Sequence, residues 1–338
     1  MRVLTQSIDT SLYPWFDSLW SQWRQLIASN RWSQVNLVYL PDGHGGETLI
    51  SHWLQQVLCL TIEGNDDTPC GLCKHCELMA VESYPDVHIV QPASAGKSIT
   101  VDQVRLCNDF ATKAATLGGK KIIIIDGVEQ LNVAASNALL KTLEEPTGNT
   151  FFLLIAGVKR GILPTILSRC QQWNYQVYTD HQLIQWLQER MSHTAQPQTI
   201  IDPAYLKLTQ YAPLKTKMFL DSGETEHATE CFEKLMHYLK GRSHHSDVVS
   251  LVLKDPITRL CWLWYWISDA QKHHFITNEG VSLLPKSKEL SQYLNYNDLY
   301  LTQQSLSHLV ADLKSSIGLN SELLITNWLL TLEEKVCL

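Results

Sequence analysis

The sequence predicts an α/β fold on a parallel sheet in its first half, followed by an all-helical second half. The segment Ile122-Ile123-Ile124-Ile125 is β-branched throughout, which is typical of a strand whose two faces are both buried in a parallel sheet. Other short apolar runs, at 35–40, 86–90 and 151–155, alternate with helical stretches. After about residue 178 the strand signals fade, and helical patterns rich in Leu and Trp take over.

The predicted elements of the first half follow one another with short connections. The strand 35–40 leads through a glycine loop into a helix expected over about 48–59. Asn132 is the expected N-cap of a helix over 133–145, and Pro146 ends that helix because it cannot continue the backbone hydrogen-bond ladder. Strand, helix and strand in this order indicate a parallel sheet covered by helices.

The length of 338 residues fits two or three domains of ordinary size. We expect an α/β core over 1–177, a small helical domain over 178–222 and a larger helical domain over 223–338.

The composition indicates a globular protein without a general DNA-coating surface. Hydrophobic residues make up 45% and charged residues 18% of the chain, and the net charge is -7. We find no apolar signal core near Met1, and the run 260–267 is far shorter than the roughly 20 residues that span a bilayer. We therefore expect a cytoplasmic chain that contacts no membrane and whose cysteines are reduced or bind metal.

The segment Gly43-His44-Gly45-Gly46-Glu47-Thr48 follows a strand and opens a helix, the place where a phosphate-binding loop lies. A working loop ends in Lys followed by Ser or Thr, but this chain has Gly46 and Glu47 there. The preceding glycine position is Leu40 or Pro41, depending on the alignment. A cation for the phosphates is missing and an anion is added, so we expect this chain to bind no ATP.

The end of the central strand also departs from an active ATPase. Asp126 stands where a strand-end acid is expected, but the next residue is Gly127 in place of a glutamate that would activate water. Glu129 follows two residues later and is expected to point elsewhere. A glycine turn after a strand is often purely structural, yet together with Gly46 and Glu47 it favours a degenerate nucleotide site.

Four cysteines within 18 residues indicate a metal site: Cys59, Cys70, Cys73 and Cys76. Their spacing matches a tetrahedral zinc site, which would hold one structural ion because four protein ligands leave no open position. Ordinary core thiols and an iron–sulfur cluster are the alternatives. His75 offers another ligand, but as a neighbour of Cys76 it is expected to face solvent.

Several segments in order resemble the bacterial clamp-loader AAA+ subunits, the tau/gamma and delta-prime group. The most specific are the cysteine motif, the stretch 137–146 (Asn-Ala-Leu-Leu-Lys-Thr-Leu-Glu-Glu-Pro) and Ser168-Arg169-Cys170. Tyr84-Pro85-Asp86 and Gly118-Gly119-Lys120 also agree. The segments 13–15 and 318–326 resemble the delta-prime branch of gamma-proteobacterial type.

The resemblance implies an AAA+, P-loop NTPase-like core over 1–177 with a zinc module at about 59–76. A three-helix lid over 178–222 and a helical collar over 223–338 would follow. It implies a hetero-pentameric ring with delta and tau/gamma subunits, which loads the sliding clamp onto primed DNA. The delta-prime branch does not hydrolyse ATP; Leu214 near the lid-arginine position and Ala156-Gly157 at the sensor position agree with this.

In this family the arginine of the Ser-Arg-Cys tripeptide reaches into the ATP site of the next subunit. The resemblance therefore implies that Arg169 acts in trans as an arginine finger, with Ser168 positioning it. Without the surrounding motif, Arg169 would be interpreted as an ordinary surface residue.

Two other functions remain open. An ATP-hydrolysing motor of tau/gamma type is disfavoured by Gly46 and Glu47. A zinc-containing nucleic-acid-binding module would need a basic face beside the cysteines, and the neighbouring segment 63–67 is acidic.

Overall fold

A computed structural model describes residues 12–60, 69–81, 83–94, 96–191, 201–275, 282–315 and 318–336. The chain divides into two compact units, one ending at Tyr178 and the other beginning at Thr179. The acidic segment 63–67 lies outside the described residues.

The first unit contains a parallel five-stranded sheet in the order β2-β3-β4-β1-β5. The four predicted strands all lie in it, and a fifth, β5, was not predicted. The strands are β1 (Val35–Tyr39), β2 (Val87–Val90), β3 (Lys121–Asp126), β4 (Thr150–Ala156) and β5 (Gln171–Asn174).

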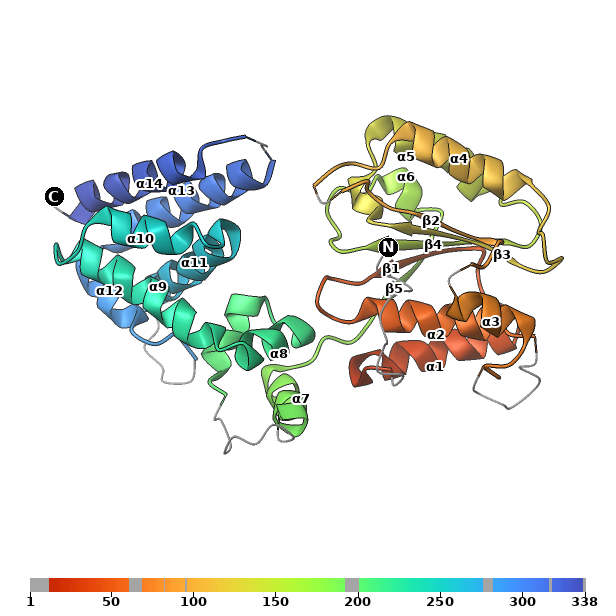
Figure 1. The fold of residues 1–338 in the computed structure, drawn as a ribbon, viewed down its shortest axis with the longest axis horizontal. Coiled ribbons are helices and arrows are strands. Elements are labelled where there is room, and N and C mark those ends of the chain that lie inside the picture. Colours follow the sequence, from red (N-terminus) through yellow and green to blue (C-terminus); the bar gives the residue numbers. More distant parts are fainter. Residues whose placement is uncertain are drawn as a thin grey trace. The chain divides into compact units, whose positions relative to one another are not determined.

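Helices cover both faces of this sheet (Figure 1). On one face lie α1 (Asp17–Ala28), α2 (Gly46–Leu58) and α3 (Lys74–Ala80); on the other lie α4 (Val101–Thr112), α5 (Val133–Glu144) and α6 (Pro164–Leu167). Short 3-10 turns are η1 (Pro14–Phe16) and η2 (Val128–Gln130). Ile122, Ile123, Ile124 and Ile125 are fully buried because both faces are covered. The predicted α/β class is therefore confirmed.

The register of the central strands brings three strand ends to one edge of the sheet. Tyr39 at the end of β1 pairs with Ala156 at the end of β4, and Asp126 at the end of β3 pairs with Ile155. The connections after β1 and β4 enter helices on opposite faces, α2 and α6 (Figure 1). Such a switch point is where parallel α/β folds place ligands.

A cluster of four tryptophans fixes α1, α2 and β5 to one another. Trp23 and Trp53 are fully buried, and Trp32 stacks on Trp173 with ring centroids 5.7 Å apart. Trp173 Nε1 also donates to Oδ1 of Asn36 on β1, at 2.9 Å. This hydrogen bond satisfies a fully buried amide and anchors β5, whose other residues are exposed.

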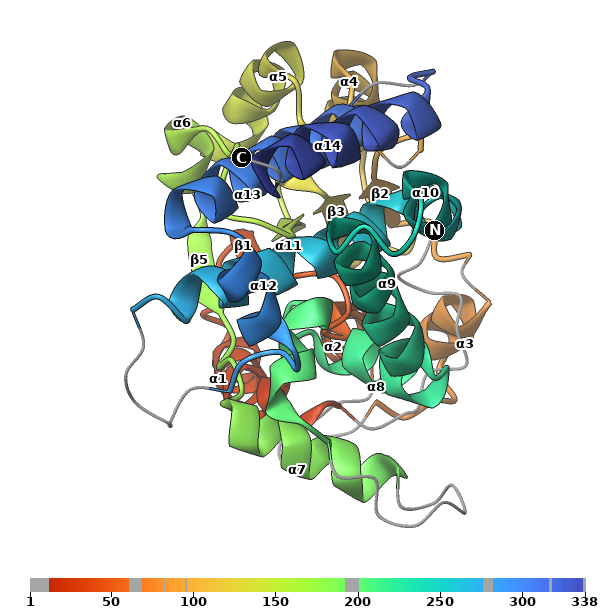
Figure 2. The same ribbon diagram turned by 90° about the vertical axis from the view of Figure 1, so that its left-hand side faces the viewer.

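The second unit is helical, as predicted. Figure 2 shows α13 and α14 side by side, and these helices pack together with α11 and α10. Its elements are α7 (Asp180–Met191), η3 (Pro203–Thr209), α8 (Pro213–Asp221), α9 (Glu224–Leu239), α10 (His245–Val252), α11 (Pro256–Lys272), α12 (Ser287–Tyr293), α13 (Tyr296–Ser315) and α14 (Ser321–Val336).

One buried carboxylate connects the start of this unit to its central helix. Asp269 on α11 is fully buried; its Oδ2 lies 2.8 Å from Lys207 Nζ and accepts from the Leu284 amide at 2.9 Å. Lys272 Nζ lies 2.7 Å from Oδ1. Leu208 and Phe219 also share one apolar core with Trp262 and Trp266 of α11. The proposed lid boundary at 222–223 stays a prediction.

In the described part of the chain, none of the helices combines the length and the apolar character that crossing a membrane requires.

We predict that Asp269→Asn destabilises the second unit by about 3 kcal/mol at pH 7, because Lys207 would remain buried without its anionic partner. Burial alone would raise the pKa of Asp269, but the hydrogen bonds from Lys207 and Lys272 outweigh burial and lower it. The stabilisation is therefore present above about pH 4 and is lost as the pH falls further.

Urea unfolding at several pH values measures this effect, with Asp221→Asn as the control in an exposed pair that contributes little. The difference in the free energy of unfolding between wild type and Asp269→Asn should become smaller below about pH 4. A difference that is equally large at pH 3 and pH 7 contradicts the assignment.

Candidate functional site

The glycine loop lies at the sheet edge where β1 ends, and its own chain fixes its shape. Gly43 and Gly45 have φ of 83° and 73°, a left-handed conformation that glycine adopts without strain, and Gly45 caps α2. The His44 carbonyl accepts from Trp15 Nε1 at 2.8 Å, and the His44 ring packs against Tyr175. The loop therefore turns through two left-handed glycines and is held by aromatic residues.

The space where the loop lysine would start is already filled. A Cβ atom built on Gly46 would lie 2.9 Å from both Cβ and Cδ1 of Leu40. Leu40 is itself buried and occupies one of the two possible positions of the missing first glycine. The two losses are therefore coupled: the side chain at position 40 takes the room that a side chain at position 46 would need.

Carboxylates replace the cation at this edge. Burial raises the pKa of Asp126, and the nearby Glu47 carboxylate raises it further. The Thr48 hydroxyl donates to the Gly45 carbonyl at 2.7 Å, so its proton is committed inside the loop. The structure thus places the Glu47 carboxylate close enough to Asp126 to raise the pKa of Asp126.

The position after Asp126, where an active ATPase is expected to have a glutamate, is a glycine. Gly127 has φ of 85°, and a Cβ there would lie 2.9 Å from Gln130 Nε2. Glu129 is held by the loop after β4, where its Oε1 accepts from the Gly157 amide at 3.0 Å. Burial raises the pKa of Glu129, and the Gly157 hydrogen bond offsets part of that shift.

Cys59, Cys70, Cys73 and Cys76 converge from segments on both sides of 61–68, with their sulfurs all within 4.8 Å of one another. The Cys59–Cys70 and Cys70–Cys76 sulfur distances are 3.6 and 4.0 Å. Four sulfurs at about 2.3 Å from a tetrahedral zinc ion lie about 3.8 Å apart. Burial raises the pKa of the Cys76 thiol to about 12. The cluster could hold a metal ion.

The expectation that His75 faces solvent is wrong. His75 is buried, and its Nδ1 lies 2.5 Å from the Tyr84 hydroxyl. Its position next to Cys76 suggested exposure, but His75 is the second residue of α3 and packs against Tyr84, which precedes β2. This contact supports the loop behind the cysteines, and only the tertiary structure reveals it.

Arg169 lies between α6 and β5, well away along the chain from the glycine loop. Its Nε donates to Glu144 Oε1 at 2.9 Å, and its Nη2 donates to the same oxygen. Its Nη1 donates to the Thr165 carbonyl at 2.8 Å and to Ser168 Oγ at 3.3 Å. The Arg169 side chain remains 30% exposed. Glu144 had not been predicted as a partner.

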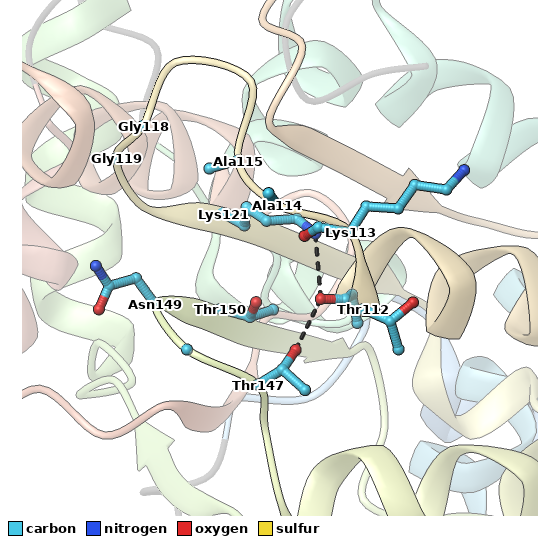
Figure 3. Close-up of a pocket in the computed structure, with 12 residues that line it drawn as sticks. Thr112, Lys113, Ala114, Ala115, Gly118, Gly119, Lys121, Thr147, Asn149 and Thr150 are labelled. Atoms are coloured by element: carbon cyan, nitrogen blue, oxygen red, sulfur yellow. Dashed lines mark hydrogen bonds between the residues drawn. The ribbon is translucent and has the colours of Figure 1, made fainter.

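A hollow of about 470 Å³ lies at the opposite edge of the sheet, where β3 and β4 begin (Figure 3). Lys121 lines it and donates to the carbonyls of Phe110, Ala111 and Lys113 at the end of α4. Its ammonium protons are therefore committed to capping that helix. Lys121 at this hollow therefore has a structural role at the end of α4.

The fold and this site define a class: an AAA+ type, P-loop NTPase-like core whose nucleotide loop lacks its lysine. Two family models match the chain. That for the DNA polymerase III delta subunit covers residues 16–179, and that for its C-terminal part covers residues 226–334.

Individual relatives specify the family further. The chain is 30% identical to DNA polymerase III subunit delta-prime of Haemophilus influenzae, over 97% of this chain and 98% of that protein. It is 32% identical to the Pseudomonas aeruginosa delta-prime subunit over 84% of each chain, and 30% identical to that of Escherichia coli over 95% of each. The chain belongs to the DNA polymerase III delta-prime family, which confirms the predicted resemblance.

Among solved structures, a gamma subunit-related protein of DNA polymerase III from Thermotoga maritima aligns over 94% of this chain and 99% of its own, with 16% identity and a TM-score of 0.41.

We predict that Gly46→Lys/Glu47→Thr does not restore ATP binding, because the lysine stem would collide with Leu40. Adding Leu40→Gly should open the space and strengthen ATP binding at least tenfold over the double variant. Calorimetry with Mg-ATP measures the affinity, and thermal unfolding checks that each variant folds.

Leu40→Gly alone is the control and should bind no ATP, since no cation has been added. Hydrolysis should be absent throughout because Gly127 supplies no base. A double variant that binds as tightly as the triple variant would show that Leu40 is not the obstacle.

Proposed function

We propose that this chain is the non-hydrolysing subunit of a clamp loader in the DNA polymerase III holoenzyme. It assembles in the cytoplasm with delta and tau/gamma subunits in a hetero-pentameric ring, which loads the sliding clamp onto primed DNA. Family membership supports the complex. The contact between Leu40 and the position of Gly46 carries the proposal of a subunit without its own ATPase.

The chemical role of the chain is to act on a neighbour's nucleotide. Arg169 supplies a guanidinium in trans to the adjoining ATP site, where it stabilises charge on the transferring phosphoryl group. Ser168 positions it, as the contact of Ser168 Oγ with Nη1 supports. The glycine loop of this chain has Gly46 where a phosphate-binding loop has its lysine. We therefore assign Arg169 to a phosphate that a neighbouring subunit holds.

The cysteine cluster holds one structural zinc ion in this proposal. Four thiolates complete a tetrahedral site and leave no position for water, so the ion contributes to folding and not to catalysis. It would link the end of α2 to the start of α3, since Cys59 follows one helix and Cys73 caps the other.

The main alternative is an ATP-hydrolysing motor of tau/gamma type. It requires a loop lysine and a water-activating glutamate, and the sequence has Gly46 and Gly127 at these places. ATP hydrolysis by the isolated chain would favour this alternative.

We predict that Arg169→Ala leaves folding and ring assembly nearly intact, since a partly exposed ion pair contributes little stability. It should slow ATP hydrolysis at the adjoining site and impair clamp loading. Arginine fingers accelerate hydrolysis by about 10³-fold to 10⁵-fold. Because only one of several ATP sites is affected here, the hydrolysis rate of the whole ring should fall by a smaller factor.

Arg169→Lys should restore little of the ATP hydrolysis and clamp loading, because an ammonium lacks the planar fork of donors. DNA-stimulated ATPase and clamp-loading assays on the reconstituted ring measure both variants. Normal rates with Arg169→Ala would remove the chemical role proposed here.

We predict about one zinc and no iron per chain by elemental analysis. Cys73→Ser should leave three sulfur ligands and weaken zinc retention against a chelator, whereas Cys261→Ser in the second unit should not. A freshly purified, metal-free chain with all four thiols free to titrate would contradict the zinc assignment.

A further inference from the structure

We propose that Glu144 is a positioning residue for Arg169: it holds the guanidinium in the orientation that the neighbouring nucleotide requires. This inference rests on the proposed function of Arg169 as a residue acting in trans. It extends that function to a second residue, which lies 25 positions earlier at the end of another helix.

Glu144 binds one edge of the guanidinium. Nε and Nη2 of Arg169 both donate to Oε1, and the Thr165 carbonyl accepts from Nη1 at 2.8 Å. Because the guanidinium is planar and rigid, contacts on two of its sides fix its plane. The arginine would otherwise sample many rotamers, and ordering it would cost conformational entropy each time it met a phosphate.

This arrangement leaves a donor for a ligand. Nη2 carries two N–H groups, and among the described residues only Glu144 accepts from that nitrogen. This leaves one N–H of Nη2 without an acceptor among the described residues, on a side chain that is 30% exposed. Arg169 is therefore held at its base and sides while part of its fork stays available for an anion.

Stability does not explain the pair. Both side chains are substantially exposed, 30% for Arg169 and 47% for Glu144, and pairs of this kind contribute little to folding. Glu144 is also the last residue of α5, where the helix dipole disfavours an anion. A carboxylate that the helix dipole disfavours, and that nevertheless binds Arg169, points to a role in orienting the guanidinium.

The neighbouring Glu145 supplies a matched control. It is exposed, and its side chain makes no hydrogen bond or ion pair with any residue that the structure describes. Replacing Glu145 by Ala removes the same charge from the same helix end while leaving the contacts of Arg169 in place.

The test uses the reconstituted ring with full-length subunits and single-turnover ATP hydrolysis with DNA and clamp present. Glu144→Ala should slow the step that depends on Arg169 by roughly threefold to tenfold, with a smaller effect on the ATP concentration at half-maximal rate. Glu144→Gln, which keeps the shape and one acceptor oxygen, should be slowed less. Glu145→Ala should match the wild type.

A double-mutant cycle separates positioning from a general structural role. In the Arg169→Ala background, Glu144→Ala should have no further effect, because it acts only through the arginine. Suppose that Arg169→Ala slows hydrolysis. The positioning role is then wrong if Glu144→Ala alone leaves the hydrolysis rate unchanged or raises it. It is also wrong if the double variant loses as much rate as the two single losses combined. If Arg169→Ala itself has no effect, the proposed function fails instead.

Discussion

The parallel pairing of β1, β3 and β4 is the constraint on which the rest of the structure depends. Tyr39 pairs with Ala156, and Asp126 pairs with Ile155, so three strand ends meet at one edge. This register places the glycine loop beside Asp126 and lets Glu129 reach the loop after β4. The isoleucines of β3 are fully buried because helices cover both faces of the sheet.

In the proposed function, that edge keeps the glycine loop of a nucleotide site but lacks the cation and the space that a bound nucleotide requires. Leu40 fills the room beside Gly46, Glu47 adds an anion near Asp126, and Gly127 occupies a backbone conformation that suits no other residue well. In the proposed function, each change removes a different requirement of ATP hydrolysis. The loop then serves as architecture, and Arg169, held by Glu144, offers its cation to a ligand outside the chain.

Much of this was predictable from local sequence, because local signals determine it. The isoleucine run specified β3, Asn132 caps α5 through the Ala135 amide, and the cysteine spacing brought four sulfurs together. The rest depends on contacts between distant segments. Three such contacts leave no periodic pattern in the sequence: Leu40 with Gly46, Tyr84 with His75 and Glu144 with Arg169. Strand β5 was missed because it has a single buried residue, which packs on tryptophans distant in the sequence.

The most direct measurement is a structure of the reconstituted clamp loader bound to a slowly hydrolysed ATP analogue, primed DNA and the clamp. The account predicts Arg169 within hydrogen-bond distance of the terminal phosphate held by the adjoining subunit, and no nucleotide at residues 43–48 of this chain. A nucleotide bound in that loop, or an Arg169 guanidinium beyond the reach of every phosphate, would contradict it.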